Sequence, residues 1–480
     1  MHFSLTRSNR PGQQVKLLSL IVLCPLQLGF LVERSRSQGE WDYGAGEIQA
    51  VSNTPGAISS GTVTTLDQLG ISSPDELESN ESETASHQPQ FFDSPPGPKQ
   101  STEWRPASTP TWKGAYTGDR GDDTSGGAVL SRPEVSVSSD TGITWDDNIF
   151  LRETSPESDW IYHLSSLLRI RSGDFTHAYS SRGEVEYRPS LFIFTDHSSE
   201  NSHDHDARAS IQHAWNRLTT GADVSYQKTS GGNSDFGDRV DKQEFGAEVL
   251  AAYAIGDRTR AEFTAAYTNE RYDTEFAFDS NDISGKLFAD YQASASTHVA
   301  VGGSIGQLET DQSPAQDYQQ GLVRMRSQLT PKWQLRAEGG VDRRESGNGD
   351  DTTPVFEIGL RGESDSAMLD LKASREIQPS GALGDQNYIS TQLGLSGSQR
   401  VTDRFKLTLG GGIEWLDYTQ RGAGVGASRN DTYYFLRPGI RYKFNRFHGD
   451  LYYEFLKNSS DSSGSSYDVN RIGASIGTEF

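Results

Sequence analysis

Cysteine is almost absent from this chain of 480 residues, because its only cysteine is Cys24, within an apolar N-terminal stretch. If that stretch is removed, the mature protein has no thiol, which excludes a disulfide framework. Cys24 could also indicate lipoprotein processing. Leu23, however, stands immediately before it, where such processing requires a small residue. This neighbour disfavours a lipid anchor.

Apolar residues are also scarce. The chain is 33% hydrophobic with 49 Gly and a mean hydropathy of −0.65, which is poor material for a large soluble core. A membrane helix needs about 20 apolar residues, and outside the N-terminal stretch no apolar run approaches that length. This excludes a helical membrane protein. A disordered acidic chain is the simplest alternative. The 21 Phe, 19 Tyr and 8 Trp argue against it. Five could belong to interfacial aromatic girdles, namely Trp145, Trp160, Trp215, Trp333 and Trp415.

Positive charge is the third shortage. The 44 Lys and Arg against 66 Asp and Glu give a net charge of −22, which offers no footprint for nucleic acid. Residues 40–130 are especially acidic, and Ser, Thr, Gly and Pro dominate them. We expect this part of the chain to be a disordered periplasmic segment. Its isolated aromatic residues could instead contact a partner or a barrel lumen.

Residues 1–39 have the layout of a secretory signal peptide. Arg7, Arg10 and Lys16 precede an apolar stretch over residues 17–32, and small residues follow it. No clean cleavage motif is present, so the cleavage site stays open, and an uncleaved anchor is the alternative. We expect secretion through the inner membrane and a folded domain over residues 131–480.

What the folded domain does have is long stretches in which apolar and polar residues alternate. The last stretch puts Ile472, Ile476 and Phe480 on one face and Arg471 and Glu479 on the other. The same alternation occurs in residues 245–255, 333–342, 405–415, 433–444 and 447–456. A period of two predicts a strand with a different solvent on each side. Stretches of about ten residues match a tilted strand that crosses a bilayer.

From Glu134 onward, the pattern predicts an all-β fold, a transmembrane antiparallel up-and-down β-barrel of about 18 strands (roughly 16–18). Short connections are expected near residues 256–257, 294–297, 330–332, 363–366, 402–403 and 445–446. Long ones are expected near residues 196–206, 228–242, 272–282, 309–316, 345–353, 377–386, 417–431 and 457–466. Outer-membrane barrels have short periplasmic turns and long extracellular loops. An even strand number places both ends of the domain, including Phe480, at the periplasmic rim.

Two short motifs at the ends of this domain carry a resemblance to a known family. The first expected strand contains Trp145-Asp146-Asp147-Asn148-Ile149, and the last contains Asp468-Val469-Asn470-Arg471 before the terminal Phe480. With these motifs, residues 134–480 resemble the beta-barrel porin-2 (OmpL-like) family of bacterial outer-membrane proteins. The resemblance implies an outer-membrane location and a pore-type role, or a role associated with polysaccharide export. It offers no catalytic residue to carry over, and it leaves residues 40–130 outside.

The polar strand faces are the candidate functional surface, because a wide barrel would use them to line an aqueous lumen. The candidate pore-lining residues are Arg336, Glu338, Asp342, Lys406, Glu414, Arg437, Arg441, Lys443, Asp450 and Glu454. Charge pairs between strands would stabilise the wall and create a transverse field. The four basic residues of β-strand stretches 405–415 and 433–444 could form a strip for an anionic solute or an acidic polysaccharide. The net acidity favours cations instead, and a solvated wall without a particular substrate is equally open.

Other chemistry has little support. His203 and His205 could share a metal ion, but no further His lies at metal-motif spacing, which favours the charged end of an extracellular loop. Residues 348–351 lack the carboxylate spacing of a calcium loop and predict a turn. The histidines are scattered and no G-x-S-x-G motif occurs. We therefore expect no enzyme activity, no metal and no cofactor.

The sequence thus predicts a porin-like outer-membrane channel for passive passage of small hydrophilic solutes. The alternative is a non-conducting barrel, or a partner in extracellular polysaccharide export, whose lumen is occupied by residues 40–130 or by a loop. Expected partners are outer-membrane lipid, the barrel-assembly machinery, and small solutes or polysaccharide. Ile472, Ile476 and Phe480 are expected to serve as the assembly signal.

Overall fold

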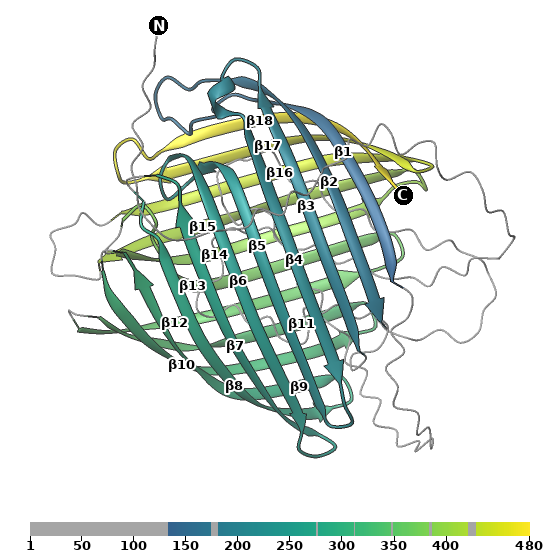
Figure 1. The fold of residues 1–480 in the computed structure, drawn as a ribbon, viewed down its shortest axis with the longest axis vertical. Helices are drawn as coiled ribbons and strands as arrows, with labels where there is room; N and C mark the ends of the chain where they lie inside the picture. Colours follow the sequence, from purple (N-terminus) through teal and green to yellow (C-terminus); the bar gives the residue numbers. More distant parts are fainter. Residues whose placement is uncertain are drawn as a thin grey trace, which may run out of the picture. The chain divides into compact units, whose positions relative to one another are not determined.

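The computed structural model describes residues 133–173, 181–274, 277–311, 313–346, 349–383, 386–420 and 429–480. The expected signal peptide and acidic segment lie outside these described residues. Eighteen strands follow one another along the described chain (Figure 1). They are β1 (Glu134–Asp146), β2 (Asp159–Gly173), β3 (Arg182–Phe194), β4 (Ser202–Ala214), β5 (Leu218–Asn233), β6 (Asp238–Ala254), β7 (Thr259–Tyr272), β8 (Ser280–Ser294), β9 (Thr297–Thr310), β10 (Ser313–Thr330), β11 (Trp333–Ser346), β12 (Gly349–Glu363), β13 (Ala367–Pro379), β14 (Gln386–Arg400), β15 (Phe405–Gln420), β16 (Asn430–Phe444), β17 (Phe447–Ser460) and β18 (Tyr467–Glu479). One short 3-10 helix, η3 (Ser198–Glu200), lies between β3 and β4.

The strands close into a barrel. Each strand pairs with its neighbours in the sequence, and β1 also pairs with β18 in antiparallel register. This seam sets Ser139 opposite Thr478, and the Phe480 amide donates to the Val137 carbonyl at 2.9 Å. The predicted up-and-down barrel of about 18 strands is therefore confirmed. Closure matters because it removes the free strand edges that cannot be left in a membrane.

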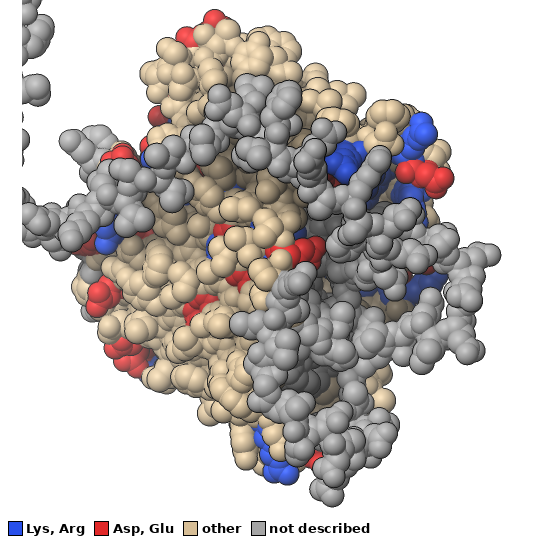
Figure 2. Space-filling view, turned by 45° about the vertical axis from the view of Figure 1, so that its right-hand side comes forward, with Lys and Arg blue, Asp and Glu red and all other residues tan. Residues whose placement is uncertain are grey.

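The two faces of the wall differ as the alternation predicted. In β18, Ile472 and Ile476 are 50% and 55% exposed on the outer face, whereas Val469 and Arg471 are 0% and 2% exposed on the inner face. The same division holds in β17, where Leu451 is exposed and its polar neighbours are not. Where Figure 2 shows described residues, most of their visible surface carries neither basic nor acidic side chains. An apolar outer face and a polar inner face fit lipid outside the wall.

No helix in the described part of the chain is long and apolar enough to cross a membrane.

Four of the five tryptophans selected from the sequence lie at strand ends, whereas Trp415 lies within β15. Trp145 lies opposite Trp160 near the β1–β2 connection, and Trp215 follows the last residue of β4. Trp160 and Trp215 are about half exposed. Amphipathic rings at the two rims of an apolar band have the positions of an interfacial girdle.

The two ends of the barrel differ in their connections. The turn end contains the start of β1 and Phe480, and most of its connections are tight, such as residues 295–296 and 445–446, as predicted. It also has a longer connection between Gly173 and Arg182 that the alternation did not predict. We call the opposite end the mouth. It contains the β1–β2 connection, the β3–β4 connection and every later connection from an odd-numbered strand to the next strand.

Several predicted long connections at the mouth are wrong. β9 ends at Thr310 and β10 begins at Ser313, within the loop expected over residues 309–316. The loop expected over residues 228–242 shrinks to residues 234–237, because β5 and β6 pair as far as Asn233 and Asp238. In these stretches both strand faces carry polar residues, so the apolar–polar alternation of the sequence stops. The backbone pairing between the strands nevertheless continues through them. The wall therefore extends beyond the apolar band as strands.

Several ladders between the described strands are interrupted at prolines, because proline has no backbone N–H to donate. The β2–β3 ladder skips Pro189 and resumes, and the β16–β17 ladder skips Pro438 and resumes. The β12–β13 ladder runs from Glu363 to Phe356, stops beside Pro354 and does not resume toward the mouth. β12 stays paired with β11 over this stretch.

Glycines on the inner face make room for rings from the neighbouring strands. A Cβ on Gly473 would overlap the ring of Tyr452, and one on Gly306 would overlap the ring of Tyr318. The two tyrosines are 8% and 1% exposed. The high glycine content is therefore explained in part by close packing of aromatic rings against the inner wall.

Candidate functional site

All ten candidate pore-lining residues occupy inward positions of their strands. Asp342, Glu454, Arg441 and Glu414 are buried, at 0%, 4%, 5% and 7% exposure. Arg336, Glu338, Lys406, Arg437 and Asp450 are half-buried, and Lys443 is exposed near the turn end. The strand register thus places the selected side chains on one continuous inner surface.

Most of these side chains have partners of opposite charge or an aromatic ring. Arg441 Nε lies 2.7 Å from Asp450 Oδ1, and Lys286 Nζ lies 3.0 Å from Glu338 Oε1. Further contacts are Arg344–Asp342 at 3.1 Å, Arg471–Glu454 at 2.9 Å and a hydrogen bond from Ser390 to Glu414 at 2.6 Å. Charge pairs that span strands give the inner wall a transverse field.

The basic strip expected on β15 and β16 is only partly assembled. Lys406 lies opposite Arg441 in the register, but Arg441 is paired with Asp450. Arg437 lies farther along β16, with its guanidinium 4.3 Å from the centre of the Tyr452 ring. The strip is therefore interrupted by an acid and an aromatic ring.

A second inner cluster contains residues that were not selected from the sequence. Arg324 and Arg326 on β10 reach across two strands to Glu262 on β7. Arg324 is 1% exposed, and its guanidinium lies 4.2 Å from the centre of the Phe288 ring. The signal was present, since two arginines at alternate positions share the inner face of a strand. Their common partner lies 62 residues away for Arg324, which sequence alone does not indicate.

The β1–β2 connection begins with a tight set of polar contacts. Asp146 accepts from Arg471 Nε at 2.7 Å and from the Asn148 amide at 2.9 Å. The Asp147 carboxylate accepts from the amide and the side chain of Asn470, both at 2.7 Å. Asn148 in turn binds the backbone of Arg152. The Asp-Asp-Asn motif therefore joins the connection to β18 at the mouth.

These contacts direct the β1–β2 connection inward, so that its apolar residues pack inside the barrel. Ile149 is 2% exposed within an inner apolar cluster that includes Ile161 and Phe194. Leu151 is 1% exposed within a second cluster, which includes Tyr433 and Leu456. Leu151 has a φ of 56°, which is a strained conformation for this residue type. One side of the mouth is thus filled by the β1–β2 connection.

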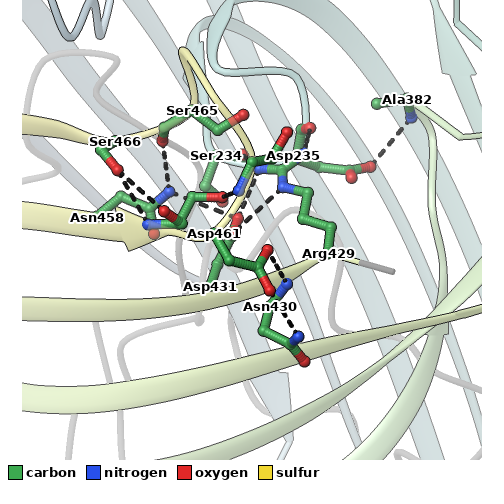
Figure 3. Close-up of polar contacts among 12 residues, drawn as sticks. Ser234, Asp235, Ala382, Arg429, Asn430, Asp431, Asn458, Asp461, Ser465 and Ser466 are labelled. Atoms are coloured by element: carbon green, nitrogen blue, oxygen red, sulfur yellow. Dashed lines mark hydrogen bonds and ion pairs between the residues drawn. The ribbon is translucent and has the colours of Figure 1, made fainter. Parts of the chain in front are cut away.

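On another side of the mouth, the β5–β6 connection contacts the β13–β14 connection. These two connections lie far apart around the barrel, since β5 and β13 are eight places apart in the closed strand order. The Asp235 carboxylate accepts from Ser380 Oγ at 2.9 Å and from the amides of Gly381 and Ala382 at 2.8 and 3.1 Å. Arg429, before β16, donates to the carbonyls of Asp235 and Ser234. We name this arrangement the cross-tie (Figure 3).

Burial changes the pKa of the acidic group in the cross-tie. Asp235 is 9% exposed, and burial raises the pKa of its carboxyl, against hydrogen bonds and the Arg429 charge, which lower it. Arg429 also pairs with Asp431 at 2.6 Å. Figure 3 shows Asp431, Asn430 and Asp461 grouped beside Arg429. The cross-tie narrows the mouth with a polar and partly ionic group.

The histidine pair lies in a different place from the one we expected. His203 and His205 belong to β4, not to the end of a loop. His205 Nδ1 lies 2.9 Å from the Tyr187 hydroxyl. Among the described residues, no group of three or more His, Cys, Asp or Glu is arranged to hold a metal ion. Asn348, in the stretch tested for calcium, lies outside the described residues.

A closed antiparallel barrel with an apolar outer face and a charged inner face defines the class of the protein. It is a transmembrane β-barrel of the outer-membrane type. No model of a known protein family matches the chain, and no curated protein matches it.

Solved structures resemble it only distantly. OccK2 (OpdF) from Pseudomonas aeruginosa is 11% identical with a TM-score of 0.40, over 73% of this chain and 99% of that one. OccAB4 from Acinetobacter baumannii is 9% identical with a TM-score of 0.38, over 72% and 98%. The siderophore receptor PirA from Pseudomonas aeruginosa is 11% identical with a TM-score of 0.35, over 72% and 80%. With TM-scores this low, these similarities carry no argument about what this chain binds or transports.

Proposed function

We propose that the protein is a porin-like channel in the bacterial outer membrane, which lets small hydrophilic solutes pass without an energy source. The observation that supports this most strongly is the charged inner wall of a closed 18-stranded barrel. Barrels of about 16–18 strands leave an aqueous channel, and charged groups along such a channel set its selectivity. The ten candidate residues are proposed to line it.

The mouth is the proposed control point for passage. The β1–β2 connection fills one side of it, and the cross-tie joins connections that lie eight strands apart. Both are polar or well packed, so they restrict solute size and present charge where a solute enters. The interrupted basic strip lies on β15 and β16, toward the turn end.

The proposal is tested by conductance of the full-length protein in planar lipid bilayers. We expect discrete current steps in salt solution, with a reversal potential that reports the balance between the two charge signs of the wall. A protein that inserts, shown by heat-modifiable gel migration, and yet gives no current steps would contradict the channel.

The location and partners are proposals of the same kind. We expect fractionation to place the protein with outer-membrane lipid, after export by its signal peptide and insertion by the barrel-assembly machinery. Membership of the OmpL-like family stays a prediction, as does the absence of enzyme activity. No observation on the described residues favours the export alternative, and residues 40–130, which would fill the lumen, lie outside them.

A further inference from the structure

Two histidines on β4 lie on the outer face of the wall, not on the face of the lumen. His203 and His205 occupy the same alternate positions as Ile211, which is 61% exposed on the outer face. His203 is exposed and His205 is half-buried. Polar side chains on the outer face of a membrane-spanning strand are costly in hydrocarbon, so their depth in the bilayer decides what they contact.

The position of the histidines along β4 sets their depth. His205 precedes Trp215, at the turn-end rim of the same strand, by ten residues. At about 3.3 Å per residue, the two are about 33 Å apart along the strand, and a tilt of about 40° reduces this to about 25 Å along the membrane normal. The apolar band of an outer-membrane barrel is about 25 Å tall. The histidines therefore lie at the mouth-side interface, at the level of the lipid headgroups.

A lysine and a tyrosine flank the histidines on the two neighbouring strands. Lys228 of β5 lies directly opposite His205 in the register, and the Tyr187 hydroxyl of β3 lies 2.9 Å from His205 Nδ1. The rings of His203 and His205 meet edge to face, with 5.4 Å between their centres. β3, β4 and β5 are adjacent in the wall (Figure 1). These four side chains form one surface, which we name the mouth-side basic patch.

The cation of this patch has no acidic partner within the part of the chain that the structure describes. Lys228 forms no ion pair there, and the residue opposite it on β6 is the neutral Gln243. Asp241, the nearby acid on this face of β6, lies one alternate position nearer the mouth. On the inner face of the same two strands, by contrast, Arg208 is paired with Asp223 at 2.8 Å. The outer face thus keeps a positive charge that the barrel itself does not neutralise.

The surroundings of the patch match an anionic lipid better than a soluble anion. On its turn-end side, the outer faces of β4 and β5 carry Ile211, Val224 and Tyr226, which are 61%, 42% and 37% exposed. Acyl chains cover such a surface in a bilayer. Ammonium, imidazole N–H and phenol groups all donate hydrogen bonds, and a phosphate is a strong acceptor for them. A lipid with a phosphate headgroup satisfies both parts of this surface at once.

We propose that the mouth-side basic patch binds the phosphate headgroup of a lipid in the leaflet on the mouth side. Lys228 supplies the positive charge, and His203 and His205 donate N–H groups. Tyr187 holds the His205 ring through Nδ1, which leaves Nε2 for the phosphate. The acyl chains lie along the apolar band below the patch. The site is on the outer face, so it is separate from the proposed passage of solutes.

The test measures lipid binding to the full-length protein in detergent micelles at pH 7, by native mass spectrometry. Phosphatidic acid is titrated, with phosphatidylcholine of the same acyl chains and glycerol 3-phosphate as separate probes. We expect phosphatidic acid to bind at least about tenfold more tightly than phosphatidylcholine, and added salt to reduce this preference. Equal binding of the two lipids would overturn the proposal. Glycerol 3-phosphate that binds as tightly as phosphatidic acid would also overturn it, because the site would then take soluble phosphate.

Two variants locate the site. Lys228→Gln is expected to lower the affinity for phosphatidic acid about fivefold, and the further changes His203→Asn and His205→Asn should remove the preference over phosphatidylcholine. The matched control is Lys332→Gln, which removes an exposed lysine between β10 and β11 at the turn end, and we expect it to bind as the original protein does.

Heat-modifiable gel migration shows which variants are folded, and Lys228→Gln alone decides the matter where the triple variant does not fold. An equal loss in Lys228→Gln and Lys332→Gln, or no loss in Lys228→Gln, would contradict the site. Current steps from a protein without any preference for phosphatidic acid would refute the site and leave the channel intact.

Discussion

The mouth and the turn end of this barrel are built from the same strands and are held in different ways. At the mouth, connections fold inward and are fixed by buried polar groups, such as Asp146 with Arg471 and Asp235 with Ser380. At the turn end, three pairs of the described strands are joined by two-residue turns, and the chain closes through backbone bonds between Val137 and Phe480. The mouth therefore depends on particular side chains, and the turn end depends mainly on the backbone.

The difference separates assembly of the barrel from the proposed passage of solutes. In the proposed channel, a side chain at the mouth can change what enters, because it stands where the connections meet. A residue at the turn end can change how the barrel is inserted, because both ends of the folded domain lie there. One deletion and three substitutions test this division, ordered from the largest expected effect to the smallest.

Deletion of Phe480 tests the turn end. Phe480 is 72% exposed on the outer face, on the same side as Ile472 and Ile476, and we propose that these three residues form the assembly signal. We expect the deletion to lower the amount of protein in the outer membrane severalfold, measured by fractionation, while the refolded protein conducts as before. Phe480→Tyr keeps the ring and is the control. Normal insertion of the deleted chain would show that Phe480 is not the signal.

Arg471→Met tests the buried pairs at the mouth. Arg471 is 2% exposed and holds Asp146 at 2.7 Å and Glu454 at 2.9 Å. Its loss leaves two buried acids without their cation, and we expect the free energy of unfolding in urea to fall by about 3–5 kcal/mol. Lys443→Met, at an exposed position near the turn end, is expected to change it by no more than about 0.5 kcal/mol. Equal effects would remove the contrast between the two ends.

Asp235→Ala tests the cross-tie. The change deprives Ser380, Gly381 and Ala382 of their common acceptor, and we expect a loss of about 1–3 kcal/mol in stability. Single-channel conductance should rise, because the β5–β6 connection loses its bonds to residues 380–382 and is held only by the bonds from Arg429 to the carbonyls of Ser234 and residue 235. Asp365→Ala, in the β12–β13 connection at the turn end, is the control. Unchanged conductance in a folded Asp235→Ala protein would show that the cross-tie does not restrict the channel.

His197 gives the smallest effect, one that depends on pH. Hydrogen bonds to Asp159 and Glu157 raise the pKa of His197, with both nitrogen–oxygen distances at 2.9 Å. Because the folded pKa lies above the ordinary value, the stabilisation is complete below about pH 6.5 and is lost as the pH rises through the folded pKa. Hydrogen-exchange protection of the His197 amide should fall over that range. His197→Asn should abolish this pH dependence, and its persistence would exclude His197 as the cause.

The strand faces could be predicted from the sequence because the alternation is strict inside the apolar band. Ile472 and Ile476 were assigned to one face and Glu454 to the inner wall, and each lies there. The alternation becomes unreliable beyond the band, where both faces meet water. The stretch over residues 309–316 therefore looked like a loop, although β9 and β10 continue through most of it.

The contacts that define the site could not be predicted, because they depend on closure. Lys286 and Glu338 are three strands apart, and Asp235 meets Ala382 across 147 residues of sequence. Alternation gives each residue a face but no partner. Arg324 was missed for this reason, since its contacts with Glu262 and Phe288 join β10 to β7 and β8.

The incomplete ladder between β12 and β13 fixes how deeply the barrel can sit in the bilayer. Peptide groups that lack a partner strand must meet water, because hydrocarbon offers them no hydrogen bond. At β12, the hydrocarbon core of the bilayer must therefore end at Pro354 or on its turn-end side. The outer face agrees, since Ile358 is 43% exposed on the turn-end side of Pro354, and Asp350 is exposed on the mouth side. Pro354 thus marks the boundary between the hydrocarbon core and water on the outer face of β12.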